Sequence, residues 1–350
     1  ANDWSGNLVV AYRPHELGPK LNTVRSDAQR YVVGAEGQAA GWDFDVAAVY
    51  SLNTQEHAYG GSGLHIGRFI PALRTGLINP WGPSAPEGQA LLASTTYQGT
   101  PQSARGSTSL AHAVISREIT RLPSGPMAIA LGAEARRERL SYDWDPAVLS
   151  GGFVPGANVP QSKTGARGVH ALYAELKLPI ARGLDAQLAA RLDDYSDFGS
   201  TTNPKLALRW QAHDELLLRG SWGQGFRAPP LYALDAPPGV TRLVAGLPDP
   251  VRCPVTGTVN DCFVLVQAYA GGNPLLQPET SKQWNLGVVW QVARGVALSV
   301  DHWRIRHDGI IAPLDPVVAL TYHARFNDRI IRGPVDPAFP ALPGPIVGLN

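Results

Sequence analysis

The chain has 350 residues, of which 30 are Lys or Arg and 29 are Asp or Glu, so its net charge is +1 at pH 7. This balance gives no electrostatic reason to expect a nucleic-acid partner. Charged residues make up only 17% of the chain, below the roughly 25% typical of soluble domains. No run of about 20 apolar residues occurs, which excludes helical membrane spans. The apolar stretches are instead interrupted at every second residue, which is typical of barrel strands between lipid and water.

This alternation predicts ten or eleven strands that pair as consecutive hairpins. In one of the first strands, Trp42 and Phe44 share one face, whereas Asp43 and Asp45 share the other. The predicted strands, in chain order, are 32–39, 42–53, 103–121, 127–144, 172–180, 184–193, 205–211, 215–223, 282–292 and 296–306. The remaining C-terminal residues, 308–350, show little periodicity and are expected to form a loop.

The alternation is clearest in strands 172–180 and 184–193, where apolar residues occupy the even positions and most polar residues the odd ones. A slip of one residue would turn charged side chains toward lipid, namely Asp185, Arg191 and Asp193. A basic side chain there costs about 2–4 kcal/mol at the bilayer midplane, and an acidic one somewhat less. The register of these strands is therefore strongly specified.

The connections between strands are sorted by length. Short turns are expected at every second junction, at residues 40–41, 122–126, 181–183, 213–214 and 293–295. Most of the other junctions are far longer, as at 60–100 and 145–165. Because antiparallel strands place alternate connections on opposite rims, one rim has tight turns and the other has long loops. Outer-membrane barrels have this asymmetry, with their long loops outside the cell.

Two short motifs flank a Gly- and Pro-rich excursion of the chain. The first consists of Gly225, Phe226, Arg227, Ala228 and Pro229, and the second, within residues 273–281, includes Asn273, Pro274, Pro278, Glu279 and Thr280. In this order, and between barrel-like strands, the two motifs resemble those of the TonB-dependent receptors of the bacterial outer membrane. The resemblance covers most of residues 24–309.

The resemblance implies an all-β fold, an antiparallel transmembrane β-barrel with long extracellular loops and short periplasmic turns, located in the cell outer membrane. Barrels of this family have twenty-two strands filled by a plug domain, so residues 1–350 are expected to form a partial barrel domain of about half that wall. No plug domain, TonB box or closing aromatic strand is visible within the chain.

The resemblance also implies active import of a scarce nutrient, such as a ferric siderophore, cobalamin, an oligosaccharide or a peptide. The expected partners are the TonB–ExbB–ExbD complex, acting through the plug, and outer-membrane lipid. No cofactor and no catalysis are expected, because the sequence has no G-x-S-x-G, H-E-x-x-H or Walker A pattern. The alternatives are a passive porin, a secreted sugar-binding β-protein and, with no nucleophile–base pair in evidence, a barrel hydrolase.

The motif residues are expected to be architectural. Pro229 ends a strand because proline removes a ladder donor, and Arg227 could pair with an acid on the plug or on the neighbouring wall. His302 and His307 are an odd number of residues apart, so they point to opposite faces of a strand and predict no metal site. Substrate contacts are expected in the long loops, from aromatic and arginine side chains suited to stacking and anion recognition: Trp81, Tyr97, Arg242, Arg252, Tyr269, Tyr322 and Arg325.

The two cysteines, Cys253 and Cys262, are nine positions apart within one of these loops. Pro254, Gly257 and Asn260 allow the chain to turn back between them, which predicts a disulfide in an oxidising compartment. Two unrelated thiols are the alternative, and a zinc site is less favoured because no second Cys or His pair lies at ligand spacing.

Overall fold

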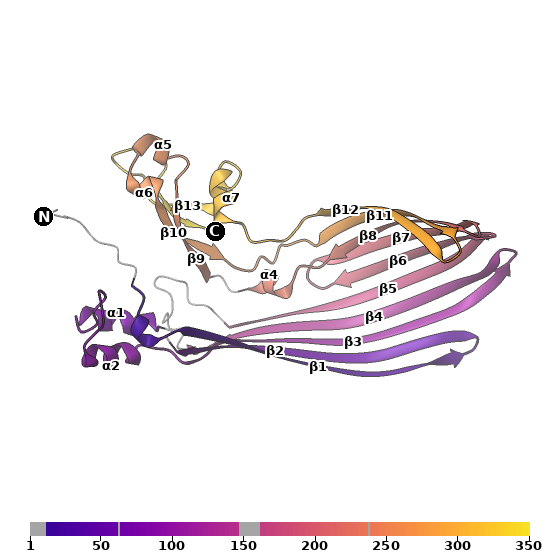
Figure 1. Cartoon of the computed structure of the whole chain (residues 1–350), viewed down its shortest axis with the longest axis horizontal. Coiled ribbons are helices and arrows are strands. Elements are labelled where there is room, and N and C mark those ends of the chain that lie inside the picture. Colours follow the sequence, from indigo (N-terminus) through magenta and orange to yellow (C-terminus); the bar gives the residue numbers. More distant parts are fainter. Residues whose placement is uncertain (1–11, 62–63, 147–161, 237–238) are drawn as a thin grey trace.

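The computed structural model describes residues 12–61, 64–146, 162–236 and 239–350, and its main feature is an antiparallel sheet of ten strands (Figure 1). The strand order is β1-β2-β3-β4-β5-β6-β7-β8-β11-β12, so each strand pairs with its neighbour in the chain except where β8 meets β11. The strands are β1 (Lys20–Ala39), β2 (Trp42–Gly61), β3 (Gly99–Leu122), β4 (Gly125–Trp144), β5 (Lys163–Ala181), β6 (Leu184–Tyr195), β7 (Gly199–His213), β8 (Leu216–Arg227), β11 (Glu279–Ala293) and β12 (Val296–Asp308). The sheet is not closed, because β1 and β12 form its two edges.

The two faces of the sheet differ in polarity, as the alternation predicts. On β5 and β6, Leu172 lies opposite Leu192, and Leu176 lies opposite Leu188. Leu172 is 61% exposed, whereas Asp193 on the other face of β6 is only 2% exposed. We call the face with the apolar rows the outer face and the opposite face the inner face. Their polarity fits a wall between lipid and a wet interior.

One end of the sheet carries only tight turns, and the long connections gather at the other end (Figure 1). The turn between β5 and β6 contains Gly183, whose φ of +76° is strained for any residue with a side chain. A Cβ at this position would also lie 2.8 Å from the carbonyl oxygen of Gln211 on β7. The turn therefore needs glycine both for its backbone conformation and for its close approach to the next hairpin.

The connection between β2 and β3 contains two helices that sequence reasoning missed. These are α1 (Ile66–Arg74) and α2 (Pro86–Ser94), and they enclose a small core in which Ile78 is 2% exposed and Leu92 is fully buried. The short 3-10 helix η1 (His15–Leu17) joins this unit, because the Glu16 carboxylate accepts a hydrogen bond from the Ser84 backbone N–H at 2.6 Å. Within the described residues, no helix is both long and apolar enough to cross a membrane.

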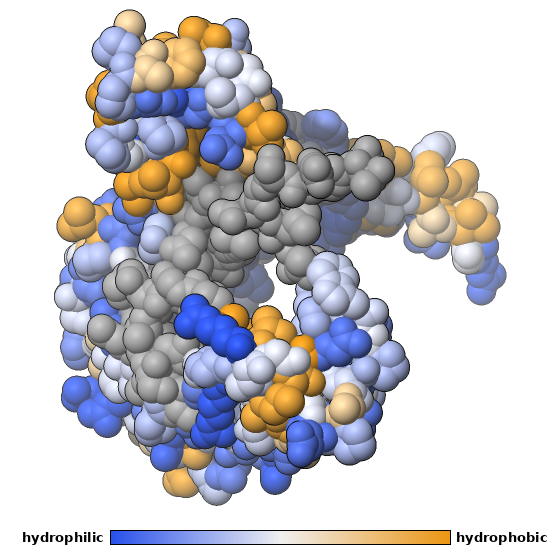
Figure 2. All heavy atoms as spheres, turned by 90° about the vertical axis from the view of Figure 1, so that its left-hand side faces the viewer, coloured by the Kyte–Doolittle hydropathy of each residue, from blue (hydrophilic) through white to orange (hydrophobic). Residues whose placement is uncertain are grey.

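A second sheet lies at the loop end, and it corrects the expectation that residues 308–350 form only a loop. Its order is β13-β14-β10-β9, formed by β9 (Gly239–Leu247), β10 (Val264–Ala270), β13 (Ile330–Arg332) and β14 (Ile346–Leu349). The helices α5 (Cys253–Thr256), α6 (Val259–Cys262) and α7 (Pro316–Thr321) and the 3-10 helix η2 (Asn327–Arg329) accompany it, whereas α4 (Leu231–Asp235) lies against β4 and β5 of the wall. We call this unit the loop sheet. Viewed from this end, the molecule presents hydrophilic and hydrophobic residues side by side (Figure 2).

Candidate functional site on the inner face and the loop end

Charged side chains of β4, β5 and β6 form a chain of ion pairs on the inner face. Arg136 lies between two carboxylates of its own strand, Glu134 at 2.9 Å and Glu138 at 2.8 Å. Arg167 on β5 reaches Glu138 at 2.7 Å, and Arg191 on β6 reaches Glu134 at 3.2 Å. These residues share a face because positions two apart on a strand project to the same side. The ion pairs therefore brace three neighbouring strands across their hydrogen-bond ladder.

Arg167 also joins the wall to the loops above it. Its side chain is only 9% exposed, and its Nη1 donates a hydrogen bond to the carbonyl oxygen of Pro229 at 2.7 Å. Its guanidinium carbon lies 5.2 Å from the centre of the Tyr195 ring, and the Phe226 ring meets that tyrosine edge-on at 5.7 Å. The first motif thus contacts the inner face through both a backbone oxygen and an aromatic side chain.

A cavity of about 570 Å³ lies on the inner face, close to this arginine and to α4. Arg30, Asn53, Thr108 and Glu138 line it from below, and Leu231 of α4 lines it from the loop side. The volume falls within the range typical of small-molecule sites, roughly 300–1,000 Å³. Its lining offers both cationic donors and carboxylate acceptors, which suits a polar or anionic ligand, or a polar segment of another chain.

The two motifs meet through Arg227 and Glu279. The Glu279 side chain is 1% exposed and lies 3.4 Å from Nη1 of Arg227 and 3.5 Å from Nε2 of His307. Its carboxylate also accepts a hydrogen bond from the backbone N–H of Ile311 at 2.9 Å. Arg227, which the sequence suggested would pair with an acid, thus has that acid on the neighbouring strand.

The second motif docks against α4. The backbone N–H of Asn273 donates to the carbonyl oxygen of Ala233 at 2.8 Å, and its side-chain oxygen accepts from the Leu275 N–H at 3.0 Å. At the preceding residue, Gly272, a Cβ would lie only 2.3 Å from the carbonyl oxygen of Leu234. This contact requires glycine there and fixes the path of the chain back into the wall.

Comparison with known proteins identifies the fold. The family model described as "TonB dependent receptor-like, beta-barrel" matches residues 2–333. The chain belongs to this family. A curated relative, the ferric enterobactin receptor PirA of Pseudomonas aeruginosa, is 29% identical over 198 residues, which are 53% of this chain and 24% of the relative. Members of the family are outer-membrane proteins, and the wall described above is an outer-membrane wall.

Solved structures of TonB-dependent receptors share the same fold. A mutant of the ferric enterobactin receptor PfeA from Pseudomonas aeruginosa matches with a TM-score of 0.55 and 19% identity, over 81% of this chain and 35% of that chain. The siderophore receptor PirA from the same species matches with a TM-score of 0.53 and 19% identity, over 84% of this chain and 42% of that chain. The siderophore receptor PirA from Acinetobacter baumannii matches with a TM-score of 0.52 and 20% identity, over 82% of this chain and 35% of that chain. The chain therefore spans well under half the length of the receptors it matches.

The loop residues expected to contact substrate in this receptor chain are not all accessible. Trp81 is 76% exposed and Tyr322 is 61% exposed, and Arg325 is exposed beside the Phe326 ring at 5.7 Å. Tyr97 is instead 7% exposed, and burial together with the nearby Asp145 raises the pKa of its phenol to about 12. Tyr269 is half-buried in β10, and the side chain of Arg242 lies outside the described residues.

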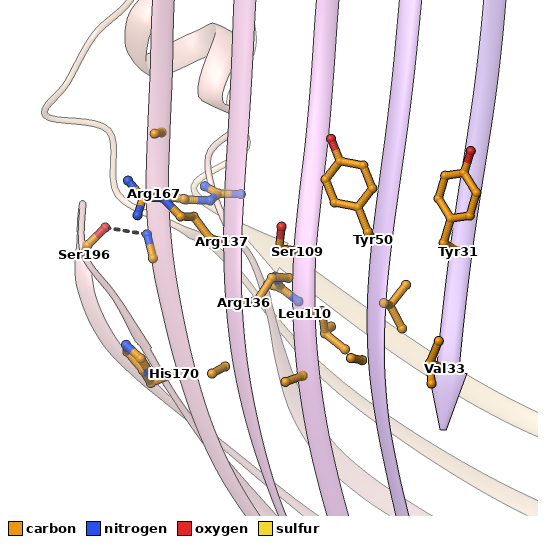
Figure 3. Close-up of a pocket in the computed structure, with 16 residues that line it drawn as sticks. Tyr31, Val33, Tyr50, Ser109, Leu110, Arg136, Arg137, Arg167, His170 and Ser196 are labelled. Atoms are coloured by element: carbon orange, nitrogen blue, oxygen red, sulfur yellow. Dashed lines mark hydrogen bonds between the residues drawn. The ribbon is translucent and has the colours of Figure 1, made fainter. Parts of the chain in front are cut away.

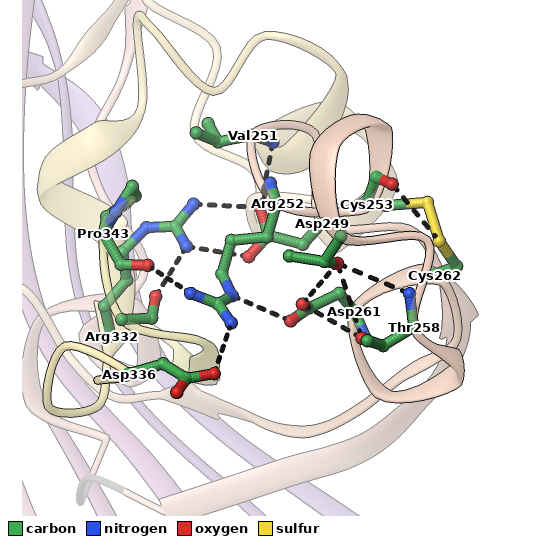
Figure 4. A network of polar contacts seen from close by, with 12 residues as sticks. Asp249, Val251, Arg252, Cys253, Thr258, Asp261, Cys262, Arg332, Asp336 and Pro343 are labelled. Carbon is green, nitrogen blue, oxygen red and sulfur yellow. Dashed lines mark hydrogen bonds and ion pairs between the residues drawn. A yellow bond between two sulfur atoms is a disulfide. The ribbon is translucent and has the colours of Figure 1, made fainter. Parts of the chain in front are cut away.

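Arg252 is buried within the loop sheet and bound to carboxylates (Figure 4). Its guanidinium reaches Asp261 at 2.9 Å and Asp336 at 3.2 Å, and it donates to the carbonyl oxygen of Pro343 at 3.0 Å. A disulfide joins Cys253 and Cys262 beside this network (Figure 4). The arrangement gives Arg252 a structural role and leaves it no free donor face for a substrate.

The inner-face network was not predicted from the sequence, although the charge pattern of one strand indicates it. Glu134, Arg136 and Glu138 alternate in sign at every second position of a predicted strand, which places opposite charges side by side on one face. The partners on β5 and β6 depend on register and could not be assigned. In the described part of the chain, no three His, Cys, Asp or Glu side chains gather so as to hold a metal ion. His302 lies 5.0 Å from Trp284, ring centre to ring centre, away from His307 and its partner Glu279.

Proposed function

We propose that residues 1–350 form about half the barrel wall of an outer-membrane active transporter, and that the protein imports a ferric siderophore. The polar cavity on the inner face, on the same side of the wall as the loop sheet, is the observation that carries this proposal. Its arginine and carboxylate lining can hold an anionic or hydrogen-bonding nutrient between the loops and a plug domain. The names of the relatives, ferric enterobactin and siderophore receptors, support this class of cargo.

Energy for import comes, in this proposal, from the TonB–ExbB–ExbD complex acting through a plug. The residues described here supply a rigid wall, a polar lining and loops that select the cargo. No covalent chemistry is assigned to them. The transport receptors among the relatives fit this assignment, and a passive pore is the competing function.

The test is growth on ferric enterobactin as the sole iron source, in a host that lacks its own receptors for this compound. We expect growth with the protein and none when the host tonB gene is deleted. Arg30→Ala removes an exposed cation from the cavity. This variant should raise the siderophore concentration needed for half-maximal growth by about tenfold. Arg182→Ala, in the turn at the opposite rim, serves as the matched control. Growth without TonB would assign a passive pore instead.

A further inference from the structure

Three arginines lie on the outer face of β3 and β4, above the apolar rows of the wall. Arg105 on β3 and Arg137 and Arg139 on β4 occupy odd positions, as do the outward-facing Ala111 and Ala135 lower on the same strands. All three arginines are exposed, and within the described residues none of them has a hydrogen bond or an ion pair. The arginines of the inner-face network are all paired with carboxylates. In the described part of the chain, these three positive charges are thus left without an ion-pair partner.

Arg137 and Arg139 lie near the upper edge of the hydrocarbon layer. Near the tight turns, Arg117 stacks over the Trp42 ring at 5.2 Å and pairs in register with Ile129 on β4. The path from Ile129 to Arg137 is roughly 27 Å along the strand, or about 20 Å across the membrane for a strand tilted by about 40°. The apolar band of such barrels is about 25 Å tall. The backbone of Arg137 therefore lies about 5 Å below the upper edge of this band, and that of Arg139, two residues further, lies at about that edge. Their long side chains can extend the guanidinium groups to headgroup level on the loop side.

Below Arg137, the outer face is hollowed into a groove with a floor of small side chains. Ala48, Ala111 and Ala135 are successive cross-strand neighbours on β2, β3 and β4. Larger residues border this floor, Val33 on β1 and His170 on β5. The hollow has a volume of about 850 Å³, and an adjoining one of about 940 Å³ shares the same floor. The lining of the groove is mostly apolar, and the groove is open toward the membrane.

The upper end of the groove has the composition of a membrane interface. Tyr31 and Tyr50 stand side by side on β1 and β2, in the cross-strand row that continues through Ser109 to Arg137 (Figure 3). Tyrosines concentrate at headgroup level because they have an apolar ring and a polar hydroxyl. Two acidic residues line the adjoining hollow. Glu134 belongs to the inner-face network, and Asp194, at the far border on β6, accepts a hydrogen bond from Ser200 at 2.7 Å.

We propose that this groove is a binding site for a phosphorylated lipid of the outer leaflet. One acyl chain lies along the alanine floor, and the phosphate is held by Arg137 and Arg139. A guanidinium binds phosphate oxygens through paired N–H donors, and among the described residues neither arginine forms an ion pair with an acid. A lipid satisfies both halves of the site at once, whereas a soluble anion would leave the apolar groove empty.

The test uses the protein purified from outer membranes in detergent and stripped of lipid. Native mass spectrometry measures how much diphosphorylated lipid A it retains, with dephosphorylated lipid A for comparison. We expect preference for the phosphorylated form. Arg137→Ala/Arg139→Ala should lower its affinity about tenfold or more, since each basic side chain near a charged headgroup contributes a factor of about five. Arg182→Ala, which removes one arginine at the opposite rim, should leave affinity unchanged.

A second pair of variants tests the groove with its charges intact. Ala111→Leu/Ala135→Leu fills the floor and should also lower the affinity about tenfold, whereas Ala190→Leu, elsewhere on the outer face, should not. Equal retention of both lipids, or no loss with either double variant, overturns the proposal. Full displacement of the lipid by inorganic phosphate overturns it as well, because that result would assign the arginines to a free anion.

Discussion

Arg227 on β8 and Glu279 on β11 occupy paired positions of adjacent strands, although they are 52 positions apart in the sequence. Each belongs to one of the two motifs that flank the excursion containing the disulfide. The Glu279 carboxylate is nearly inaccessible; Arg227 and His307 lie beside it, and it accepts a hydrogen bond from the backbone N–H of Ile311. The pair therefore closes the excursion at its base, where the chain leaves the wall and where it returns.

Replacing this carboxylate should weaken the closure. We expect Glu279→Gln to lower the free energy of unfolding by about 1–3 kcal/mol, because the buried group loses its charge-assisted partners. Urea unfolding in detergent micelles or vesicles measures the effect. Glu215→Gln is the matched control, since Glu215 pairs with His213 at an exposed turn and such pairs contribute little. Equal midpoints for the two variants would contradict a stabilising role for Glu279.

The disulfide should stabilise the loop sheet locally and leave the wall unaffected. For Cys253→Ser/Cys262→Ser we expect a loss of about 2–3 kcal/mol in local opening free energy, because the unfolded loop gains conformational freedom. Hydrogen exchange should speed up in α5 and α6 and stay unchanged in β4 and β5. Adding reductant to the unmodified protein should reproduce this result and should not affect the variant. Uniform loss of protection across the wall would contradict the local role.

The loop sheet should also open in acid. Burial tends to raise the pKa of the Asp249 carboxyl, but hydrogen bonds from Arg332 and from the backbone N–H groups of Val251 and Arg252 bring that pKa below its usual value. The pKa of Asp261 is likewise lowered, by Arg252, Thr256 and Thr258 against the effect of burial. A carboxyl with a lowered folded pKa stabilises the fold above its unfolded pKa of about 3.9, and this contribution disappears as pH falls through the folded value.

We therefore expect hydrogen-exchange protection factors in β10 to be constant from pH 7 to about pH 4 and to fall below that, ahead of those in β5. Arg332→Met removes the ion pair with Asp249 at 2.7 Å. In this variant the loss of protection should begin at higher pH, because the carboxyl no longer has its cation. A loss of protection in acid that starts in β5 would contradict this explanation. So would a loss in β10 that begins at the same pH in Arg332→Met as in the unmodified protein.

The same substitution should cost much more on the outer face than on the inner face. Leu188→Arg places a cation on the outer face of β6, where Leu188 pairs with Leu176 and Leu206. We expect a cost of about 2–4 kcal/mol for folding into lipid vesicles. Ala189→Arg, one residue further along, points to the inner face and should cost less than about 1 kcal/mol. Similar costs at both positions would mean that the faces are assigned wrongly.

Most of the wall could be predicted from sequence, because it depends on local alternation. Each of the ten predicted strands coincides with a strand of the large sheet, and residues 293–295 and 181–183 form turns as expected. The predicted strands were too short mainly at the loop end. β1, for example, begins at Lys20 rather than at residue 32. Above the lipid layer both faces meet water, so the polar–apolar contrast that marks a strand disappears there.

The loop sheet could not be predicted, because its strands are short and its pairing is non-local. β13 has three residues and β14 has four, and β10 pairs in parallel with β14 about eighty residues later in the chain. No periodicity is detectable over such lengths. For the same reason Arg252 was expected to contact substrate, whereas the structure buries it against Asp336, which is remote in sequence.

Because β8 pairs directly with β11, the register of the wall does not depend on the segment of chain between these two strands. Residues 228–278 could be exchanged like a cassette, and the barrel would keep its shape while its ligand preference changed. However, β10 pairs with β14, and Arg252 forms an ion pair with Asp336. The C-terminal part of the loop sheet would therefore have to be exchanged together with residues 228–278. Grafts between related receptors should thus succeed only when both segments come from the same donor.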